Sequence, residues 1–167
     1  NIPLIIKAYA SAFSSDDNKR LLIVGGGPIL PDLKKEVEKN NIQDKVIFTD
    51  MIDWKEIPYY YRLGDFLINA SVTETQGLTY IEALASKVPV IAQKDPCIED
   101  VIIDKKNSFV FDGEIELVEK LKESSMLEDL NQIKENAYIT SRDYTKEQFA
   151  LKVEKLYRDA IEEYSKK

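Results

Sequence analysis

Two glutamates and the residues between them have the clearest capacity for chemistry in this sequence. Glu74 and Glu82 are separated by seven residues. Apolar residues recur at helical spacing after Gly77, so Glu82 is expected in a helix and Glu74 in the loop before it. The free N–H groups and the dipole of a helix N-terminus attract an anion such as phosphate. The pair therefore outlines a site for an anionic ligand.

The same segment also permits a purely structural interpretation. Thr79-Tyr-Ile-Glu82 matches a capping box, in which Glu82 would only return a hydrogen bond to the start of the helix. Glu82 also lies at the border of the expected apolar stripe, where a carboxylate requires a partner. That stripe consists of Leu78, Ile81, Leu84, Ala85 and Val88. This segment alone leaves both the ligand site and the capping box open.

A glycine-rich turn marks a second candidate position. The apolar run over 21–24 is typical of a strand buried on both faces, and Gly25 to Gly27 follow it. Glycines let a backbone approach a ligand closely, and Pro28 favours a sharp entry into the next helix. The dinucleotide fingerprint requires a third glycine where Leu30 stands. This mismatch argues against one alternative, half of a cofactor-binding dehydrogenase.

Strands and helices are expected to alternate along most of the chain, which predicts an α/β fold. Strands are expected over 21–24, 46–48, 65–68, 88–92 and 108–111, and short helical turns over 98–103. The helix over 113–124 should direct Ile115 inward, and another helix should begin at Met126. The pattern predicts a Rossmann-like, doubly wound parallel sheet of about five or six strands, with a helical C-terminal tail.

Ligands of such sheets bind beyond the carboxyl ends of the strands. The loops over 25–27, 49–53, 74–77 and 93–99 all follow expected strands. We therefore expect these four loops to converge on one rim. This convergence favours the ligand site over the capping box for Glu74 and Glu82.

The composition excludes several classes of function. Lys and Arg total 23 against 30 Asp and Glu, and no basic cluster exceeds Lys105-Lys106, so nucleic acid is not an expected partner. Histidine is absent and Cys97 is the one cysteine, which excludes internal disulfides and Cys/His zinc sites. No apolar run approaches the roughly 20 residues that span a bilayer. We expect residues 1–167 to form a single cytoplasmic domain cut from a longer protein.

The segment from Glu74 to Glu82 resembles the paired-glutamate motif of the retaining GT-B glycosyltransferases of family 4. Other segments follow in that family's order and approximate spacing: Val24-Gly-Gly-Gly-Pro28, Val46-Ile-Phe48, Asp65-Phe-Leu-Ile-Asn-Ala-Ser71, Val88-Pro-Val-Ile-Ala92 and Lys106-Asn-Ser-Phe-Val110. The resemblance covers about residues 1–165, but only the C-terminal, donor-binding half of the two-domain enzyme. Glu74-Thr-Gln-Gly-Leu-Thr and Lys94-Asp-Pro-Cys-Ile-Glu-Asp100 are more narrowly similar to bacterial diacylglycerol glucosyltransferases.

This resemblance implies roles for individual residues. Glu82 would bind the ribose hydroxyls, and Glu74 would be the catalytic residue facing the donor sugar near its reacting carbon. The diphosphate or sugar would contact the backbone around Gln76, Gly77, Leu78 and Thr79. The phosphates would also lie close to Gly26 and Gly27. The uracil would lie against the loop of Asp50, Met51 and Ile52. Lys87 stands where the family often has a glycine at the end of the helix.

The resemblance also implies a reaction. A hexose, with glucose from UDP-glucose as the expected donor, would move with retention to a lipid or saccharide acceptor. No cofactor and no essential metal are expected, because no Asp-x-Asp pair stands in a plausible metal loop. A missing N-terminal domain would supply acceptor contacts, an Arg and a Lys upstream of Asn1 would neutralise the diphosphate, and the full enzyme would lie peripherally at the inner membrane face. This chain alone should therefore be inactive. A non-catalytic nucleotide-binding or interaction domain of doubly wound form remains the alternative.

Overall fold

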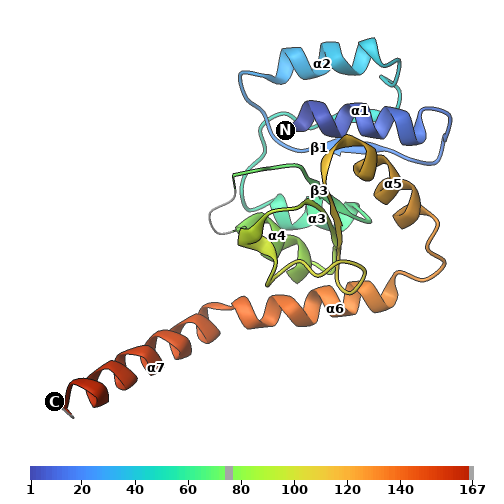
Figure 1. Cartoon of the computed structure of the whole chain (residues 1–167). Coiled ribbons are helices and arrows are strands. Elements are labelled where there is room, and N and C mark those ends of the chain that lie inside the picture. Colours follow the sequence, from blue (N-terminus) through green and yellow to red (C-terminus); the bar gives the residue numbers. More distant parts are fainter. Residues whose placement is uncertain (74–76, 166–167) are drawn as a thin grey trace.

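Parallel strands covered by helices form the centre of the molecule (Figure 1). The computed structural model describes residues 1–73 and 77–165. Its elements, in chain order, are α1 (Ile2–Phe13), β1 (Leu21–Ile23), α2 (Leu30–Lys39), β2 (Val46–Phe48), α3 (Ile57–Leu63), β3 (Leu67–Asn69), α4 (Leu78–Ala85), β4 (Val90–Gln93), the 3-10 turn η1 (Pro96–Ile98), β5 (Phe109–Phe111), α5 (Gly113–Ser125), α6 (Asn131–Ser141), the 3-10 turn η2 (Arg142–Tyr144) and α7 (Lys146–Ser165).

The strands pair in parallel, as expected, but in two hydrogen-bonded groups. β1 pairs with β2, while β3, β4 and β5 pair in that order. The expected single sheet of about five or six strands is therefore only partly confirmed, because the described residues form five strands in two groups. β1 and β3 are each three residues long and offer few backbone groups for a second ladder.

β4 is buried on both faces and separates two hydrophobic clusters. Its Ile91 belongs to a cluster that includes residues of α1, β1, α2, β2 and α5. Its Val90 and Ala92 belong to a second cluster with residues of α4 and with Ala137 of α6. Because successive side chains of a strand point to opposite faces, helices cover β4 on both sides. The first cluster also joins the two strand groups through side-chain packing.

The inward face of α4 differs from the expected stripe. Tyr80, Ala83 and Leu84 are buried, whereas Leu78 is 60% exposed. A Cβ on Gly77 would lie 2.9 Å from the ring of Tyr80, so the tyrosine packs closely over the start of the helix. At about 100° per residue, Leu78 then points nearly away from the side that Tyr80 buries. The predicted stripe was therefore wrong for Leu78, and Ala85 is exposed as well, whereas Leu84 and Val88 are buried as predicted.

Three later elements also differ from expectation. α5 buries Leu117, whereas Ile115 is 79% exposed. α6 begins at Asn131 and not at Met126, because the Asp129 side chain accepts a hydrogen bond from the Asn131 N–H at 2.7 Å and forms a turn there. The turns expected over 98–103 begin earlier, with the 3-10 turn η1 at Pro96, and continue as one hydrogen-bonded turn in which the N–H groups of Val101 and Ile102 donate to the Ile98 carbonyl.

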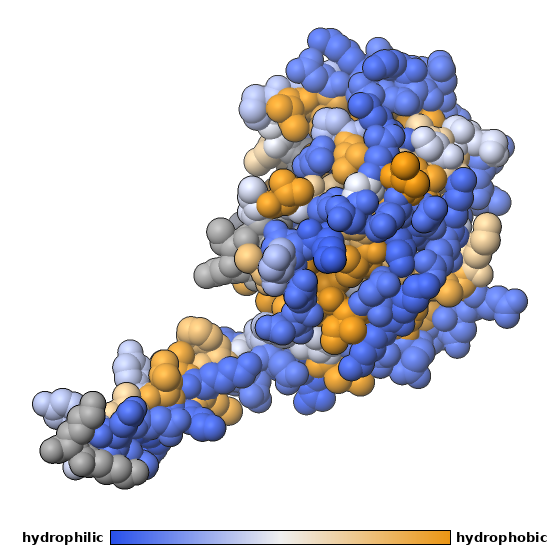
Figure 2. Space-filling model, viewed as in Figure 1, coloured by the Kyte–Doolittle hydropathy of each residue, from blue (hydrophilic) through white to orange (hydrophobic). Residues whose placement is uncertain are grey.

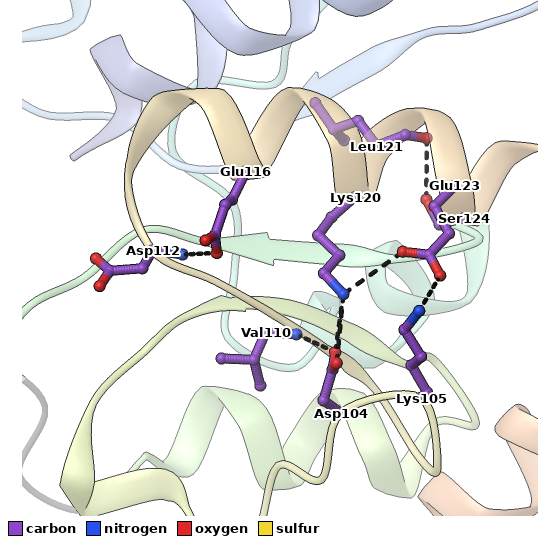
Figure 3. Close-up of polar contacts among 9 residues, drawn as sticks. All are labelled: Asp104, Lys105, Val110, Asp112, Glu116, Lys120, Leu121, Glu123 and Ser124. Carbon is purple, nitrogen blue, oxygen red and sulfur yellow. Dashed lines mark hydrogen bonds and ion pairs between the residues drawn. The ribbon is translucent and has the colours of Figure 1, made fainter.

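A network of ion pairs joins the turn before β5 to α5 (Figure 3). Lys120 Nζ lies 3.3 Å from Asp104 Oδ2 and 3.5 Å from Glu123 Oε2, and Lys105 Nζ lies 2.7 Å from Glu123 Oε1. Asp104 Oδ1 also accepts a hydrogen bond from the Val110 N–H at 2.8 Å. These contacts hold α5 beside the strand that it follows.

The expected helical C-terminal tail is present as α7. This helix extends away from the rest of the molecule and has no buried residue (Figure 1). Figure 2 shows apolar side chains along it, and its exposed apolar residues are Phe149, Leu151, Leu156, Tyr157, Ile161 and Tyr164. None of the helices in the described part of the chain is long and apolar enough to cross a membrane.

Candidate functional site

The glycine turn after β1 is held against the loop that follows β2. The Gly25 N–H donates to Thr49 Oγ1 at 3.2 Å, and Gly25 forms an isolated antiparallel bridge with Asp50. Gly25 has a φ of +112°, which a residue with a side chain rarely adopts. Two of the four loops expected at the rim are therefore in direct contact.

The next two glycines have different surroundings. A Cβ on Gly26 would lie 3.0 Å from Met51 Cγ and 3.2 Å from the Met51 backbone nitrogen. A Cβ on Gly27 would meet nothing within 4 Å. Met51 is 78% exposed and Ile52 is half-buried. Gly26 thus permits the close approach of the two loops, and Gly27 borders open space. Their predicted contact with phosphates stays a prediction.

The entry into α2 corrects one expectation. The helix begins at Leu30 with Pro31 in its first turn, and the Leu30 N–H donates to the Gly27 carbonyl at 3.1 Å. Pro28 lies inside this preceding turn and not at the helix entry. Proline suits the first turn of a helix because its missing N–H has no intrahelical acceptor there.

The start of α4 excludes the capping box. Gly77 is the N-cap residue, with a left-handed φ of +60°, and no side chain caps the helix. The first intrahelical bonds run from the N–H groups of Tyr80 and Ile81 to the Gly77 carbonyl. Leu78 and Thr79, both exposed, occupy the first turn before these bonds. Their N–H groups precede the helical ladder, where an anion is favoured.

Glu82 has a side-chain partner from another helix. Its Oε2 accepts a hydrogen bond from the Tyr61 hydroxyl of α3 at 3.0 Å, and the same hydroxyl lies 3.4 Å from the Thr79 carbonyl oxygen. The expectation that Glu82 needs a partner is confirmed, although the side chain is exposed. Burial raises the pKa of Tyr61, and the Glu82 carboxylate raises it further. Tyr61 therefore remains a protonated donor at neutral pH.

A hollow of about 470 Å³ lies between α4 and α3, together with the residues just before α3. Its lining residues are Trp54, Lys55, Ile57, Pro58, Tyr61, Glu82, Ala85 and Ser86. Trp54 is 76% exposed, so a large aromatic surface is available beside the single carboxylate of the lining. Apolar walls with a few polar groups are typical of small-molecule sites.

The sequence interpretation missed Trp54 and Tyr61. Tyr61 is one of three consecutive tyrosines, and it alone bonds to Glu82, while Tyr59 and Tyr60 line a different hollow. The signal that could have identified Trp54 is that it is the one tryptophan of the chain and follows an expected ligand loop directly.

Contacts join described residues of the expected rim loops in two pairs. The glycine turn contacts the loop over 49–51, and a Cβ on Gly77 would lie 3.7 Å from a methyl group of Ile98. The convergence of all four loops on one rim stays a prediction. Glu74 and Gln76 lie outside the described residues, so the roles predicted for them remain predictions. Within residues 1–73 and 77–165, no group of three or more His, Cys, Asp or Glu side chains could hold a metal ion.

Comparison with known proteins identifies the family. The family model for glycosyl transferases group 1 matches residues 1–140. The chain belongs to this family. An alpha-monoglucosyldiacylglycerol synthase from Streptococcus pneumoniae is 40% identical over 164 residues, a match that covers 96% of this chain and 36% of that protein. This group 1 glycosyltransferase chain therefore spans little more than a third of the length of that relative.

Solved structures share the fold of this glycosyltransferase domain. The C-terminal domain of a group 1 glycosyl transferase (LpcC) from Francisella tularensis has a TM-score of 0.77 and 27% identity, covering 88% of this chain and 79% of that one. The pneumococcal O-GlcNAc transferase GtfA, solved with UDP and GlcNAc, has a TM-score of 0.83 and 18% identity, covering 96% of this chain and 33% of that one. The first match identifies this chain as a C-terminal domain of the family.

One departure from the family pattern now has a structural explanation. Lys87 follows α4 with a left-handed φ of +61°, the conformation that a glycine adopts most easily. Its Nζ forms an ion pair with Glu135 and lies 5.2 Å from the centre of the Tyr138 ring. These contacts to α6 offset the backbone cost in this glycosyltransferase domain.

Proposed function

We propose that residues 1–167 form the donor nucleotide-sugar-binding domain of a retaining glycosyltransferase that transfers glucose from UDP-glucose to a lipid or saccharide acceptor. The observation that carries this proposal is the exposed Glu82 carboxylate beside the hollow with the aromatic wall. The name of the pneumococcal relative, a diacylglycerol glucoside synthase, supports glucose and a lipid acceptor.

The nucleoside would occupy the hollow between α3 and α4. A carboxylate offers several acceptor sites, so Glu82 suits the two adjacent hydroxyls of a ribose. The loop of Asp50, Met51 and Ile52, the proposed uracil contact, leads within a few residues to Trp54 in the wall of the hollow. The base and the ribose would therefore have neighbouring sites. GtfA, which has the same fold, was solved with UDP, and this supports a uridine nucleotide as the ligand.

The diphosphate would lie between the glycine turn and the start of α4. Gly26 and Gly27 have exposed backbone, and the N–H groups of Leu78 and Thr79 precede the ladder of α4. Fixed N–H groups stabilise the charge that develops on UDP as the sugar leaves. By resemblance alone, Glu74 faces the donor sugar near its reacting carbon and the backbone of Gln76 meets the diphosphate or sugar.

The rest of the enzyme would lie outside this chain, which spans 36% of the pneumococcal relative. We propose that an N-terminal domain provides the acceptor site, that an Arg and a Lys upstream of Asn1 neutralise the diphosphate, and that the whole enzyme lies peripherally at a membrane. The chain alone would bind the donor without catalysis, and binding would need neither a cofactor nor a metal. The cluster that joins α1 to β4 and α5 supports treating the chain as one folding unit.

Calorimetry with UDP, UDP-glucose, GDP-mannose and ADP-glucose tests the proposal. We expect the uridine compounds to bind at roughly micromolar to millimolar Kd, with weaker or no binding of the others. Addition of EDTA should leave the affinity unchanged. Folded protein that binds none of these compounds would overturn the assignment. Heat of binding with a nicotinamide dinucleotide would favour a dehydrogenase-like site instead.

Glu82→Ala should weaken UDP binding, since the ribose loses its acceptor. The matched control is Glu119→Ala, which removes an exposed glutamate of α5. Equal affinities for the Glu82 variant, the control and the unaltered chain would contradict a role for Glu82.

A further inference from the structure

The hydrogen bond between Tyr61 and Glu82 connects two helices across the hollow. Tyr61 Oη donates to Glu82 Oε2 at 3.0 Å, and both residues line the cavity. Among the described contacts, none engages Glu82 Oε1. The carboxylate therefore has one oxygen bound by the protein, and the described contacts leave the other for a ligand.

The Tyr61 hydroxyl is suited to holding Glu82 because an ionised carboxylate only accepts hydrogen bonds, so the phenol must be the donor. Burial and the adjacent carboxylate both raise the pKa of Tyr61, so its hydroxyl stays protonated and donates at neutral pH. Its ring is half-buried and its position is set by α3. The donor is thus fixed, while the Glu82 side chain is exposed and has several rotatable bonds.

The hydrogen bond between Tyr61 and Glu82 affects the orientation of the Glu82 side chain more than the stability of the fold. A hydrogen bond of a solvated carboxylate adds little to folding, because water competes for both partners. An unrestrained glutamate would instead lose side-chain entropy when it binds a ligand. A tyrosine that already selects one rotamer reduces that cost, which is the general benefit of preorganisation.

We infer that Tyr61 is a positioning residue for nucleotide binding. Its hydroxyl holds Glu82 Oε2, so that Glu82 Oε1 accepts hydrogen bonds from the vicinal ribose hydroxyls of the donor nucleotide. Tyr61 itself does not contact the reacting atoms. This inference rests on the proposed function, because it requires that the hollow binds a nucleoside.

Tyr61→Phe and the ligand pair UDP and 2′,3′-dideoxy-UDP test the inference by calorimetry. Removing the hydroxyl should weaken UDP binding about two- to tenfold, the cost of ordering one side chain. The same change should not alter the affinity for dideoxy-UDP, which lacks the hydroxyls that Glu82 would bind. In a Glu82→Ala background, Tyr61→Phe should have no further effect on UDP. Tyr59→Phe is the matched control, since Tyr59 lies on the same helix and lines a different hollow.

Two results would overturn the inference while leaving the proposed function intact. The first is unchanged UDP affinity in Tyr61→Phe. The second is an equal loss of affinity for UDP and dideoxy-UDP, which would show that the contact only connects α3 to α4 structurally. An unaltered chain that binds neither ligand would instead overturn the proposed function together with the inference. Circular dichroism and urea unfolding of each variant establish that the compared proteins are folded.

Discussion

The side-chain amide of Asn107 donates to Thr140 Oγ1 at 3.0 Å and joins the turn before β5 to α6. The same amide donates to the Val101 carbonyl at 2.9 Å, and its oxygen accepts from the Ile103 N–H at 2.9 Å. Asn107 is fully buried, so these hydrogen bonds replace water inside the protein.

Asn107→Ala should therefore destabilise the domain substantially. A buried polar group without a partner costs about 1–3 kcal/mol. This change leaves the Val101 carbonyl and the Ile103 N–H without their side-chain partner. We expect the free energy of unfolding in urea at neutral pH to fall by more than about 2 kcal/mol. Thr140→Val, which removes one of the contacts, should cost less. An unchanged unfolding midpoint in Asn107→Ala would contradict this account.

Gly27→Ala should separate ligand binding from folding. Open space surrounds the added methyl group, and Gly27 does not have a left-handed φ, so the unfolding midpoint should stay unchanged. If a phosphate contacts this backbone, the methyl group would obstruct it and UDP should bind at least about tenfold more weakly. Unfolding and calorimetry on the same preparation measure both quantities. Undiminished UDP affinity would place the diphosphate elsewhere.

Glu123 should make stability depend on pH. Its hydrogen bond with Lys105, followed by the nearby charge of Lys120, lowers the pKa of the Glu123 carboxyl below its ordinary value of 4.5. A lowered folded-state pKa stabilises the protein above the unfolded value, and this contribution is lost as the pH falls through the folded value. Glu123→Gln should thus destabilise at pH 7, and the difference should shrink below about pH 4.

Urea unfolding of both proteins at neutral pH and near pH 3 measures this difference. Glu119→Gln provides an exposed glutamate of the same helix as the control. A difference between Glu123→Gln and the unaltered chain that stays constant with pH would show that the ion-pair network does not produce it.

Removal of residues 146–167 should leave the domain folded. α7 buries none of its residues, and burial of apolar surface is the main source of stability. The urea midpoint should stay the same, and self-association measured by sedimentation should decrease, since the exposed apolar side chains are gone. Removal of residues 131–167 is the contrasting variant, because it deletes the buried Ala137 and the Asn107 contact. Unfolding of the shorter truncation would contradict the prediction.

Much of the architecture follows from the sequence. The apolar run over 88–92 predicted a strand, and β4 lies there, with Ile91 in one hydrophobic cluster and Val90 in the other. A strand of this kind can be predicted from the sequence alone, because a continuous apolar run is favourable only where both faces are buried. The order of elements, the parallel pairing and the position of Glu82 in a helix after a loop were likewise predictable.

Tertiary structure alone decided which helix faces point inward and which side chains meet. Apolar spacing placed Leu78 on the buried stripe of α4, but the close packing of Tyr80 over Gly77 turned Leu78 outward. Periodicity identifies residues that share a face, but it does not say which neighbour covers that face. The choice of Tyr61 from three tyrosines as the partner of Glu82, 21 residues later, depends on how α3 packs beside α4. No local pattern encodes that contact, because it joins two elements that only the folded chain brings together.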